Sequence, residues 1–321
     1  MVLRFTVTPD RNTVATPNKF VQRKINVTFQ LGTPSAGQPS PKFTGTQSNI
    51  VTISGLRMSA KIVKAGGRSA GSASLQIYGM TLDLMNDLST LGMRVQMWTR
   101  NSVIVTAGDD DSGMATVFQG SIISAWADFQ SAPDVPFHVE AHTGGVLSVI
   151  NVPASSYQGS TDVATIMSSL ATLAGLAFEN NNVQQKINCP YLPGSPREQI
   201  AKLAKDAGIS WFIDSGTANN AGTLIIWPKN GSRGGQIPLV SSETGMVGYP
   251  TYSAMGIIVK TLFNPAIGYG GEIKVQSSLT PANGTWAVYG LDHDLDAQVP
   301  NGQWFSTILA YNPKFNPPIL G

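Results

Sequence analysis

The C-terminal segment Thr244–Gly321 constrains the fold of this chain more than any other feature. It consists of short apolar runs, rich in β-branched and aromatic side chains and separated by Gly, Pro and Asn-Gly turn signals. This pattern predicts a small antiparallel barrel or sandwich of strands. The segment has one histidine, no cysteine and no recognisable pair of catalytic carboxylates. It therefore favours a structural role over an enzymatic one.

The pieces of this segment follow one another in a characteristic order: Thr244–Pro250, Gly256–Phe263, Asn264-Pro265, Gly270–Val275, Ala282–Val288, Asp292–Asp296 and Asn301–Phe305. This order resembles the C-terminal part of the baseplate hub proteins of contractile-tailed, Mu-like phages, members of the tail hub superfamily. The resemblance is strongest over residues 154–310, moderate over 49–149 and absent from the N-terminal loop. It implies a mainly β fold, with two tail-tube-like antiparallel β-barrel domains flanking a small α/β domain.

The chain is poor in charge. Asp, Glu, Lys and Arg make up 12% of its residues, against about 25% in typical soluble proteins. Few charges with many small polar residues suit a β-rich protein whose surface is covered by partners better than a freely diffusing enzyme. A β-rich protein that is simply poor in charge is the alternative.

The net charge of +2 is distributed unevenly along the chain. Residues 1–64 contain nine Lys or Arg and one acid, Asp10, whereas the remainder contains 12 basic and 18 acidic residues. A basic N-terminal third could meet an acidic neighbour or nucleic acid. The charges are scattered, however, without the interleaved aromatic residues of a nucleic-acid platform. We expect protein-facing or solvated charge and no specific nucleic-acid site.

Cys189 is the only cysteine, so a disulfide framework and a CxxC motif are excluded. Its setting in Asn188-Cys189-Pro190 indicates a small half-buried side chain rather than a nucleophile. The N-terminal sequence lacks the pattern of a signal peptide. No apolar run approaches the ~18 residues of a membrane span. We therefore expect no membrane partner and assembly in the host cytoplasm.

Residues 1–148 predict a first β domain with one short helix. The expected strands are Val2–Thr8, Lys24–Leu31, Ile50–Ile53, Arg57–Val63, Ser72–Tyr78, Arg94–Thr99, Ser102–Ala107, Ala115–Trp126 and Pro136–Ala141. Residues 32–48 form a long loop by composition, and residues 64–71 form the tip of a hairpin. Met80–Leu91 predicts a helix, with core-facing residues at helical spacing: Leu82, Met85, Leu88 and Leu91.

Residues 149–235 predict a small α/β domain in which a helix, a glycine and a strand occur twice. The first helix begins with Ser160 as candidate N-cap and ends at Gly175, before strand Leu176–Phe178. Its expected buried face is Val163, Ile166, Met167, Leu170, Leu173 and Ala174. The second begins with the capping box Ser195–Glu198, which has Pro at the first helical position, and ends at Gly208. Its expected face is Ile200, Leu203, Ala204 and Ala207; strands Ile209–Ile213 and Thr223–Trp227 follow.

Residues 236–321 predict a second β domain that is a divergent copy of the first. Phe118–Ala141 and Val288–Ile308 share one spacing, in which Pro followed by Asp or Asn precedes, by four residues, an aromatic that opens a strand. Two like barrels per chain would give a trimer six similar units, enough to stack on a sixfold tube. A chance match between turn-rich strands is the alternative.

Three candidate chemical sites are better explained as turns or as hydrogen-bonded polar groups of strands. Gly67–Gly71 matches the G-x-S-x-G nucleophile pattern, but a strand follows it where that motif needs a helix. Asp109–Asp111 lacks the alternating ligands of a calcium loop. His293, between Asp292 and Asp294, has no nearby His or Cys partner for zinc. We assign no catalytic, cofactor-binding or metal-binding residue.

The remaining acidic and aromatic residues also have ordinary explanations. No sequence pattern pairs the carboxylates as glycoside hydrolysis requires: Glu179, Asp206, Asp214, Glu243 and Glu272. Five tryptophans are expected to fill cores, with one or two as candidate subunit anchors: Trp126, Trp211, Trp227, Trp286 and Trp304.

The resemblance implies a structural virion protein in the phage tail baseplate. The expected form is a homotrimeric hub that joins the sixfold tail tube to the threefold central spike. Expected partners are the tail tube protein, the central spike protein and other baseplate proteins, with the tape measure protein as a further candidate. A cell-wall-degrading tail enzyme is the alternative. A cell-puncturing spike is disfavoured, since long β repeats and a histidine tip are absent from the sequence.

Overall fold

The computed structural model describes residues 21–32, 41–67, 69–90, 101–144, 147, 152–214, 222–229 and 231–312. The described chain is mainly β, as the sequence predicts, and has three α-helices. The expected strands Val2–Thr8 and Arg94–Thr99, and residues 33–40 of the expected long loop, lie outside the described residues.

The first group of elements, here called the first β group, runs from residue 24 to residue 142. Its elements are β1 (Lys24–Gln30), β2 (Ile50–Ile53), β3 (Met58–Lys64), β4 (Ser72–Tyr78), α1 (Leu82–Leu88), β5 (Ser102–Asp109), β6 (Gly113–Ala127), η1 (Phe129–Ser131) and β7 (Pro136–His142). The expected strands in this range are confirmed to within two residues. Alternate residues of β1, such as Val27 and Phe29, are buried in one core with β4 and β7.

Helix α1 is shorter than predicted, and one of its expected core residues is exposed. Met85 and Leu88 are buried, as the helical spacing predicts. Leu82, however, is 59% exposed. The helix begins at Leu82, after the N-cap Thr81, and Leu82 faces solvent while Leu84 in the same turn packs against the core. Leu91 lies outside the described residues.

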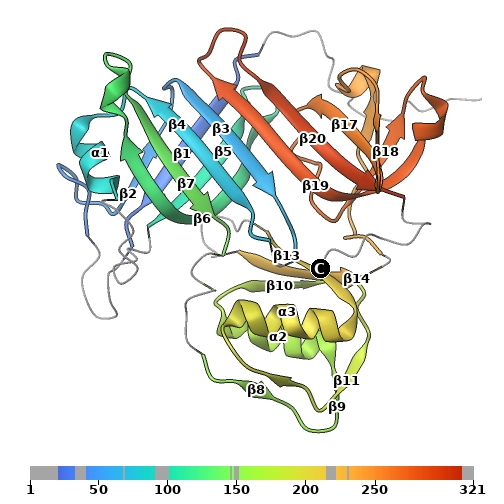
Figure 1. Cartoon of the computed structure of the whole chain (residues 1–321). Coiled ribbons are helices and arrows are strands. Elements are labelled where there is room, and N and C mark those ends of the chain that lie inside the picture. The colour runs from blue at the N-terminus through green and yellow to red at the C-terminus, as the bar shows by residue number, and fades with distance from the viewer. Residues whose placement is uncertain are drawn as a thin grey trace, which may run out of the picture.

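The second group, here called the α/β group, packs two helices on one small sheet. Its elements are β8 (Ser155–Ser156), β9 (Ser160–Asp162), α2 (Val163–Leu173), β10 (Ala177–Asn180), β11 (Lys186–Asn188), β12 (Tyr191–Leu192), α3 (Pro196–Ala207), β13 (Ile209–Asp214) and β14 (Thr223–Pro228). The sheet has the order β10-β14-β13. Figure 1 shows α2 and α3 side by side on the face of this sheet that points away from the large β assembly.

The ends of both helices follow local side-chain chemistry. Ser195 and Glu198 form the predicted capping box of α3, and Gly208 ends it in the left-handed conformation at φ 64°. The expected N-cap of α2 was wrong. Ser160 lies in β9, and the carboxylate of Asp162 caps α2 by accepting a 2.9 Å hydrogen bond from the Thr165 N–H. An ionised carboxylate suits this position because it also favours the positive end of the helix dipole.

The third group, here called the second β group, follows the α/β group. It contains β15 (Leu239–Ser241), η3 (Ser242–Thr244), β16 (Thr251–Ser253), β17 (Gly256–Leu262), β18 (Glu272–Gln276), η4 (Thr280–Ala282), β19 (Gly284–Ala297) and β20 (Trp304–Tyr311). Its own core includes Val259, Ile273 and Leu291. The β structure predicted for the C-terminal segment is present, but the runs expected separately at Ala282–Val288 and Asp292–Asp296 belong largely to one long strand, β19.

The two β groups share one sheet, and the expectation of two closed barrels is not confirmed. Thirteen strands belong to a single sheet, and the pairings of the described residues close no barrel. The connection is β19, whose last part pairs with β3 from Leu291↔Lys64 to Ala297↔Met58. The first part of β19 pairs with β18, and β20 takes its other edge. Sequence patterning predicts each strand but not which partner a long strand finds in another group.

The two β groups nevertheless repeat one strand order, as the shared spacing predicts. The order β3-β4-β7-β6-β5-β1 in the first corresponds to β16-β17-β20-β19-β18-β15 in the second. The strands also occur in the same succession along the chain. The relative direction of one strand pair differs between the groups: β1 and β5 are antiparallel, whereas their counterparts β15 and β18 are parallel. Strand β2 and helix α1 belong to the first group alone.

The packing of α2 and α3 predicts which leucines hold the α/β group together. Leu170 is 1% exposed and Leu203 0%, whereas Leu173, expected on the buried face, is 46% exposed. Leu170→Asp or Leu203→Asp buries a charge and should lower the stability of this group by at least about 3 kcal/mol. Leu173→Asp, on the same helix, is the matched control. Hydrogen exchange of the α2 amides reports the difference, and equal protection in all three variants would contradict this packing.

Candidate assembly interface

The structure places the serine motif in a hairpin connection. Residues 65–71 join β3 to β4, which pair as neighbouring antiparallel strands. The N–H of Gly67 donates a 3.0 Å hydrogen bond to the carbonyl of Trp211 in the α/β group. Ser69 therefore lies in a loop between two strands, and the strand-turn-helix context of a nucleophile elbow is not present at this motif.

The acidic run Asp109–Asp111 forms a tight turn between β5 and β6. The carboxylate of Asp109 accepts hydrogen bonds from the N–H groups of Asp111 and Ser112 at 2.9 and 2.6 Å. Slight burial opposes ionisation, but these bonds hold the pKa of Asp109 below its ordinary value. Within the described ranges, no three His, Cys, Asp or Glu side chains lie close enough together to bind a metal ion.

His293 is an interior hydrogen-bonding residue. It is 2% exposed, and its Nδ1 lies 2.8 Å from the Ser306 hydroxyl on the neighbouring strand β20. Burial, together with the nearby charge of Lys64, lowers the pKa of His293 to about 3. The ring is therefore neutral at physiological pH. Its neighbour Asp292 lies on the partly exposed side of β19, where burial and the charge of Asp294 raise the pKa of its carboxyl.

Arg233 joins two carboxylates that the sequence alone does not associate. Its guanidinium donates two hydrogen bonds to Glu179, at 3.1 and 3.0 Å, and one to Asp214 at 3.0 Å. Burial disfavours the charge of Arg233, but these carboxylates raise its pKa above the ordinary value. Because β10 carries Glu179 and β13 ends at Asp214, Arg233 ties both edges of the small sheet to the segment that leads to the second β group.

The three groups meet around Tyr269. Its ring packs against Phe212 at 4.7 Å and Trp227 at 6.3 Å between ring centroids. A Cβ atom on Gly66 would clash with the Tyr269 ring, so only glycine permits this approach of the β3–β4 hairpin. Burial raises the pKa of Tyr269 to about 12, which keeps its hydroxyl protonated. This cluster holds the α/β group at one end of the shared sheet.

At the other end of the sheet, each β group closes the hairpin between its last two strands with a backbone hydrogen bond from an aspartate N–H. In the β6–β7 turn the N–H of Asp128 donates to the Pro136 carbonyl at 3.0 Å. In the β19–β20 turn the N–H of Asp296 donates to the Gln303 carbonyl at 2.7 Å. The two carboxylates bond differently. That of Asp128 accepts the N–H of Gln130, two residues further on, at 3.0 Å, whereas that of Asp296 accepts the N–H of Gln303, at the far end of its turn, at 2.7 Å. Residues 128–136 and 296–303 are here called the paired turns.

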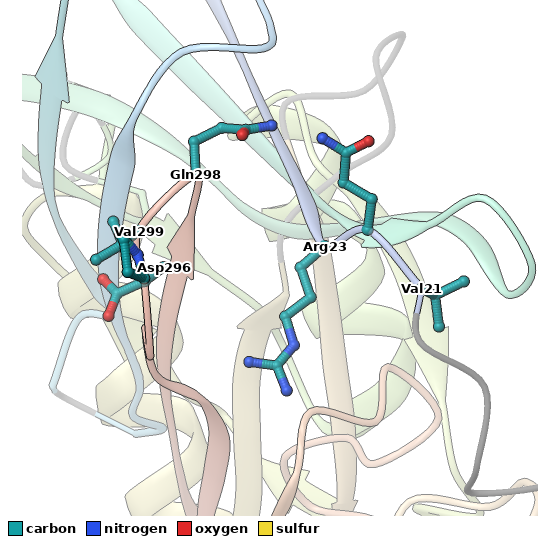
Figure 2. A pocket seen from close by; sticks show the side chains of 7 residues that line it. Val21, Arg23, Asp296, Gln298 and Val299 are labelled. Carbon is teal, nitrogen blue, oxygen red and sulfur yellow. The ribbon is translucent and has the colours of Figure 1, made fainter.

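The paired turns lie on the side of the sheet away from the α/β group, as Figure 1 shows for the hairpins that join β6 to β7 and β19 to β20. A hollow of about 390 Å³ opens beside the second turn. It is lined by Val21, Gln22, Arg23, Asp296, Gln298, Val299 and Pro300. In Figure 2 the Arg23 side chain reaches across this hollow. Its guanidinium donates to the Gly302 carbonyl at 3.3 Å and lies 5.7 Å from the Trp304 ring.

In the described part of the β assembly, exposed aromatic side chains occur at two places. Tyr249, just before the edge strand β16, is 67% exposed, and Tyr252, within it, is 87% exposed. At the first paired turn, Phe129 is 60% and Trp126 42% exposed. The other four tryptophans singled out from the sequence are buried, as expected: Trp211, Trp227, Trp286 and Trp304. Exposed aromatic residues of this kind are typical of protein interfaces.

Cys189 differs from its prediction, because it is exposed rather than half-buried. It occupies the left-handed region at φ 46°, within the connection between β11 and β12. No helix in the described part of the chain is long and apolar enough to cross a membrane.

This fold is found in solved structures of phage tail proteins. The tail protein of Neisseria meningitidis MC58 matches with a TM-score of 0.59 at 9% identity, over 91% of this chain and 97% of that chain. The 43 kDa tail protein of prophage MuSo2 from Shewanella oneidensis gives 0.56 at 10% identity, over 90% and 97%. The Escherichia coli c3393 protein, a type VI secretion component similar in structure to T4 tail proteins gp27 and gp5, gives 0.56 at 14% identity, over 84% and 76%.

The sequence itself identifies the family. A family model described as baseplate hub gp41 matches residues 25–304. The chain therefore belongs to this family of phage baseplate hub proteins, and the resemblance in its C-terminal motifs is confirmed. No curated protein matches it.

The environment of His293 predicts a specific loss of stability in acid. The folded ring stays neutral down to about pH 3, whereas the unfolded residue gains a proton below its ordinary pKa of 6.5. Acid therefore favours the unfolded chain, by up to about 1.4 kcal/mol per pH unit in that window. Between pH 7 and pH 5, the wild type should lose about 2 kcal/mol more unfolding free energy than His293→Gln. His142→Gln, at an exposed site, is the control. Identical losses in wild type and His293→Gln would refute the conclusion that the buried His293 ring stays neutral in the folded chain.

The Arg233 cluster predicts a second effect on stability. Arg233→Met leaves the carboxylates of Glu179 and Asp214 without their shared guanidinium, and should cost about 1–3 kcal/mol. Arg233→Lys should recover only part of this loss, because an ammonium cannot form the two parallel bonds to Glu179. Urea denaturation measures the unfolding free energy of both variants. Lys202→Met, at an exposed pair with Asp206 in the same group, is the control and should change stability by less than about 1 kcal/mol. An equally small effect at Arg233 would contradict its role.

Proposed function

We propose that three copies of this baseplate hub protein form a ring that joins the sixfold tail tube to the threefold central spike. The observation that carries the proposal is the strand order repeated in the two β groups. A closed ring of three chains then contains six similar β groups. Such a ring can match a sixfold partner with its β groups and a threefold partner with features that occur once per chain.

The division of the chain follows from this role. We assign residues 1–148 and 236–321 to two tube-like β domains and residues 149–235 to an α/β domain. The strand path of the shared sheet ends at β2 and β16. Unpaired strand edges favour pairing with another chain. Neighbouring copies in the ring would then complete the barrels that one chain leaves open.

The surface properties of the chain support burial in an assembly. Charged residues are only 12% of the sequence. The side chains of Tyr249 and Tyr252 project beside the free edge of β16, where they can anchor a neighbouring copy. The tail tube protein and the central spike protein are the proposed axial partners. Other baseplate proteins, and the tape measure protein within the tube, complete the proposed set, with assembly in the host cytoplasm.

The proposed role depends on matching the symmetry of two partners and requires no catalytic step. Two of the carboxylates singled out from the sequence, Glu179 and Asp214, both bind Arg233, which suits a structural cross-link better than acid-base chemistry. The alternative, a cell-wall-degrading tail enzyme, predicts that the purified chain clears cell-wall substrate. The proposed hub predicts no clearing.

Cross-linking of intact baseplates tests the copy number. The cross-linked hub should have three times the 34.0 kDa mass of the chain. Tyr252→Asp should reduce the yield of this species about tenfold, because it puts a charge into the proposed contact. Tyr191→Asp, at a 61% exposed site in the α/β group, is the control and should leave the yield unchanged. Six copies would indicate a tube subunit, and a monomer with hydrolase activity would refute the hub.

A further inference from the structure

Residues Leu82–Thr90, here called the α1 strap, bind the edge of strand β6. The backbone N–H of Thr90 donates to the Ala125 carbonyl at 2.8 Å, and the Ala125 N–H donates to the Thr90 hydroxyl at 2.9 Å. On its other edge β6 pairs with β7, where Ala125 lies opposite Val139. One threonine therefore satisfies both backbone groups of a β6 residue, as the facing residue of a paired strand would.

The equivalent position of the second β group bonds to a strand instead. Counting three residues back from the aspartate whose N–H closes each hairpin gives Ala125 in β6 and His293 in β19. His293 pairs with Ser306 of β20 on one edge and with Ile62 of β3 on the other. Thr90 thus occupies on β6 the place that β3 occupies on β19.

The repeated strand order indicates which strand belongs at this edge of β6. Strand β3, which pairs with β19 inside the chain, corresponds to β16, and β19 corresponds to β6. In the proposed ring, the contact equivalent to β19–β3 therefore joins β6 to β16 of a neighbouring copy. Tyr252 of β16 is 87% exposed. Helix α1 lies on the side of the first β group that points away from the second β group (Figure 1). A neighbouring copy would therefore meet β6 where Thr90 is bound.

We propose that the α1 strap is an autoinhibitory contact, which protects the edge of β6 in the single chain and leaves it when β16 of a neighbouring copy binds. This inference rests on the trimeric hub proposed above. An open strand edge recruits other chains, and a head-to-tail contact between copies can build filaments as well as closed rings. Thr90 covers the edge until a neighbour in the ring replaces one bridging residue by a paired strand.

The α1 strap is held by few interactions. Its helix has seven residues, of which Met85 and Leu88 are buried. The N-cap Thr81 makes no side-chain hydrogen bond to the helix, although a capping side chain normally stabilises this position. The Asp87 carboxylate accepts the N–H and the hydroxyl of Thr44 at 2.7 and 2.9 Å. So short a helix is unstable without its tertiary contacts, and a released strap therefore loses its helical hydrogen bonds.

Substitutions that weaken or strengthen the α1 strap test the proposal in opposite directions. Thr90→Val keeps the side-chain shape but removes the hydroxyl that binds the Ala125 N–H. It should lower the concentration of half-maximal trimer formation at least about fivefold, the equivalent of one hydrogen bond per chain. Thr81→Asp supplies the missing N-cap side chain and should raise that concentration at least about fivefold. Sedimentation of the full chain over a concentration series measures both shifts.

Two controls separate the strap from a general effect of losing a hydroxyl. Thr90→Ser keeps the hydroxyl and should trimerise like the wild type. Thr172→Val removes a hydroxyl that bonds within its own helix, α2, and should also leave trimer formation unchanged.

Hydrogen exchange measures release of the strap directly. Wild-type monomer and trimer are separated by size-exclusion chromatography, and the amides of residues 82–90 are followed by mass spectrometry. They should exchange at least about tenfold faster in the trimer than in the monomer, whereas the α2 amides should exchange equally in both.

Equal or slower exchange of residues 82–90 in the trimer, or unchanged trimer formation in Thr90→Val and Thr81→Asp, would overturn this inference and leave the trimeric hub intact. Failure of the wild type and Thr90→Val alike to form trimers at any concentration would overturn the hub and the inference together.

Discussion

The pairing of β19 with β3 is the interaction on which the rest of the structure depends. It joins segments from opposite ends of the chain through a register that runs from Leu291↔Lys64 to Ala297↔Met58. Closing so long a loop costs conformational entropy, which the cores on both sides of the junction must offset. With this pairing, two similar β groups become one continuous sheet, and the relation between them is fixed by backbone hydrogen bonds rather than by a flexible linker.

The junction also determines where the α/β group sits. The hairpin that follows β3 carries Gly66 under the ring of Tyr269, while Arg233 ties Glu179 and Asp214 to the start of the second β group. The α/β group, which occurs only once in the chain, is thereby confined to one end of the sheet. At the other end, each of the paired turns is held by hydrogen bonds to one aspartate. In the proposed ring of three chains, the two ends of the sheet would therefore differ in symmetry.

Much of this architecture could be predicted from the sequence because it depends on local signals. Period-two alternation located β1, and the capping box at Ser195 located α3. The shared spacing between proline and aromatic residue pointed to the repeated hairpin. The remaining features depend on contacts between distant residues. The pairing of β19 with β3, the clustering of two acids around Arg233 and the exposure of Leu82 and Leu173 leave no trace in local pattern, because tertiary packing decides them.

An image of the baseplate down its symmetry axis, at a resolution that separates strands, shows how many hub chains surround the axis and how their β groups are joined. A trimeric hub should show three α/β groups around one continuous inner wall of six β groups. The contact between neighbouring copies should alternate with the β19–β3 contact within each copy. Six α/β groups around the axis, or β groups that make no continuous wall, would contradict it.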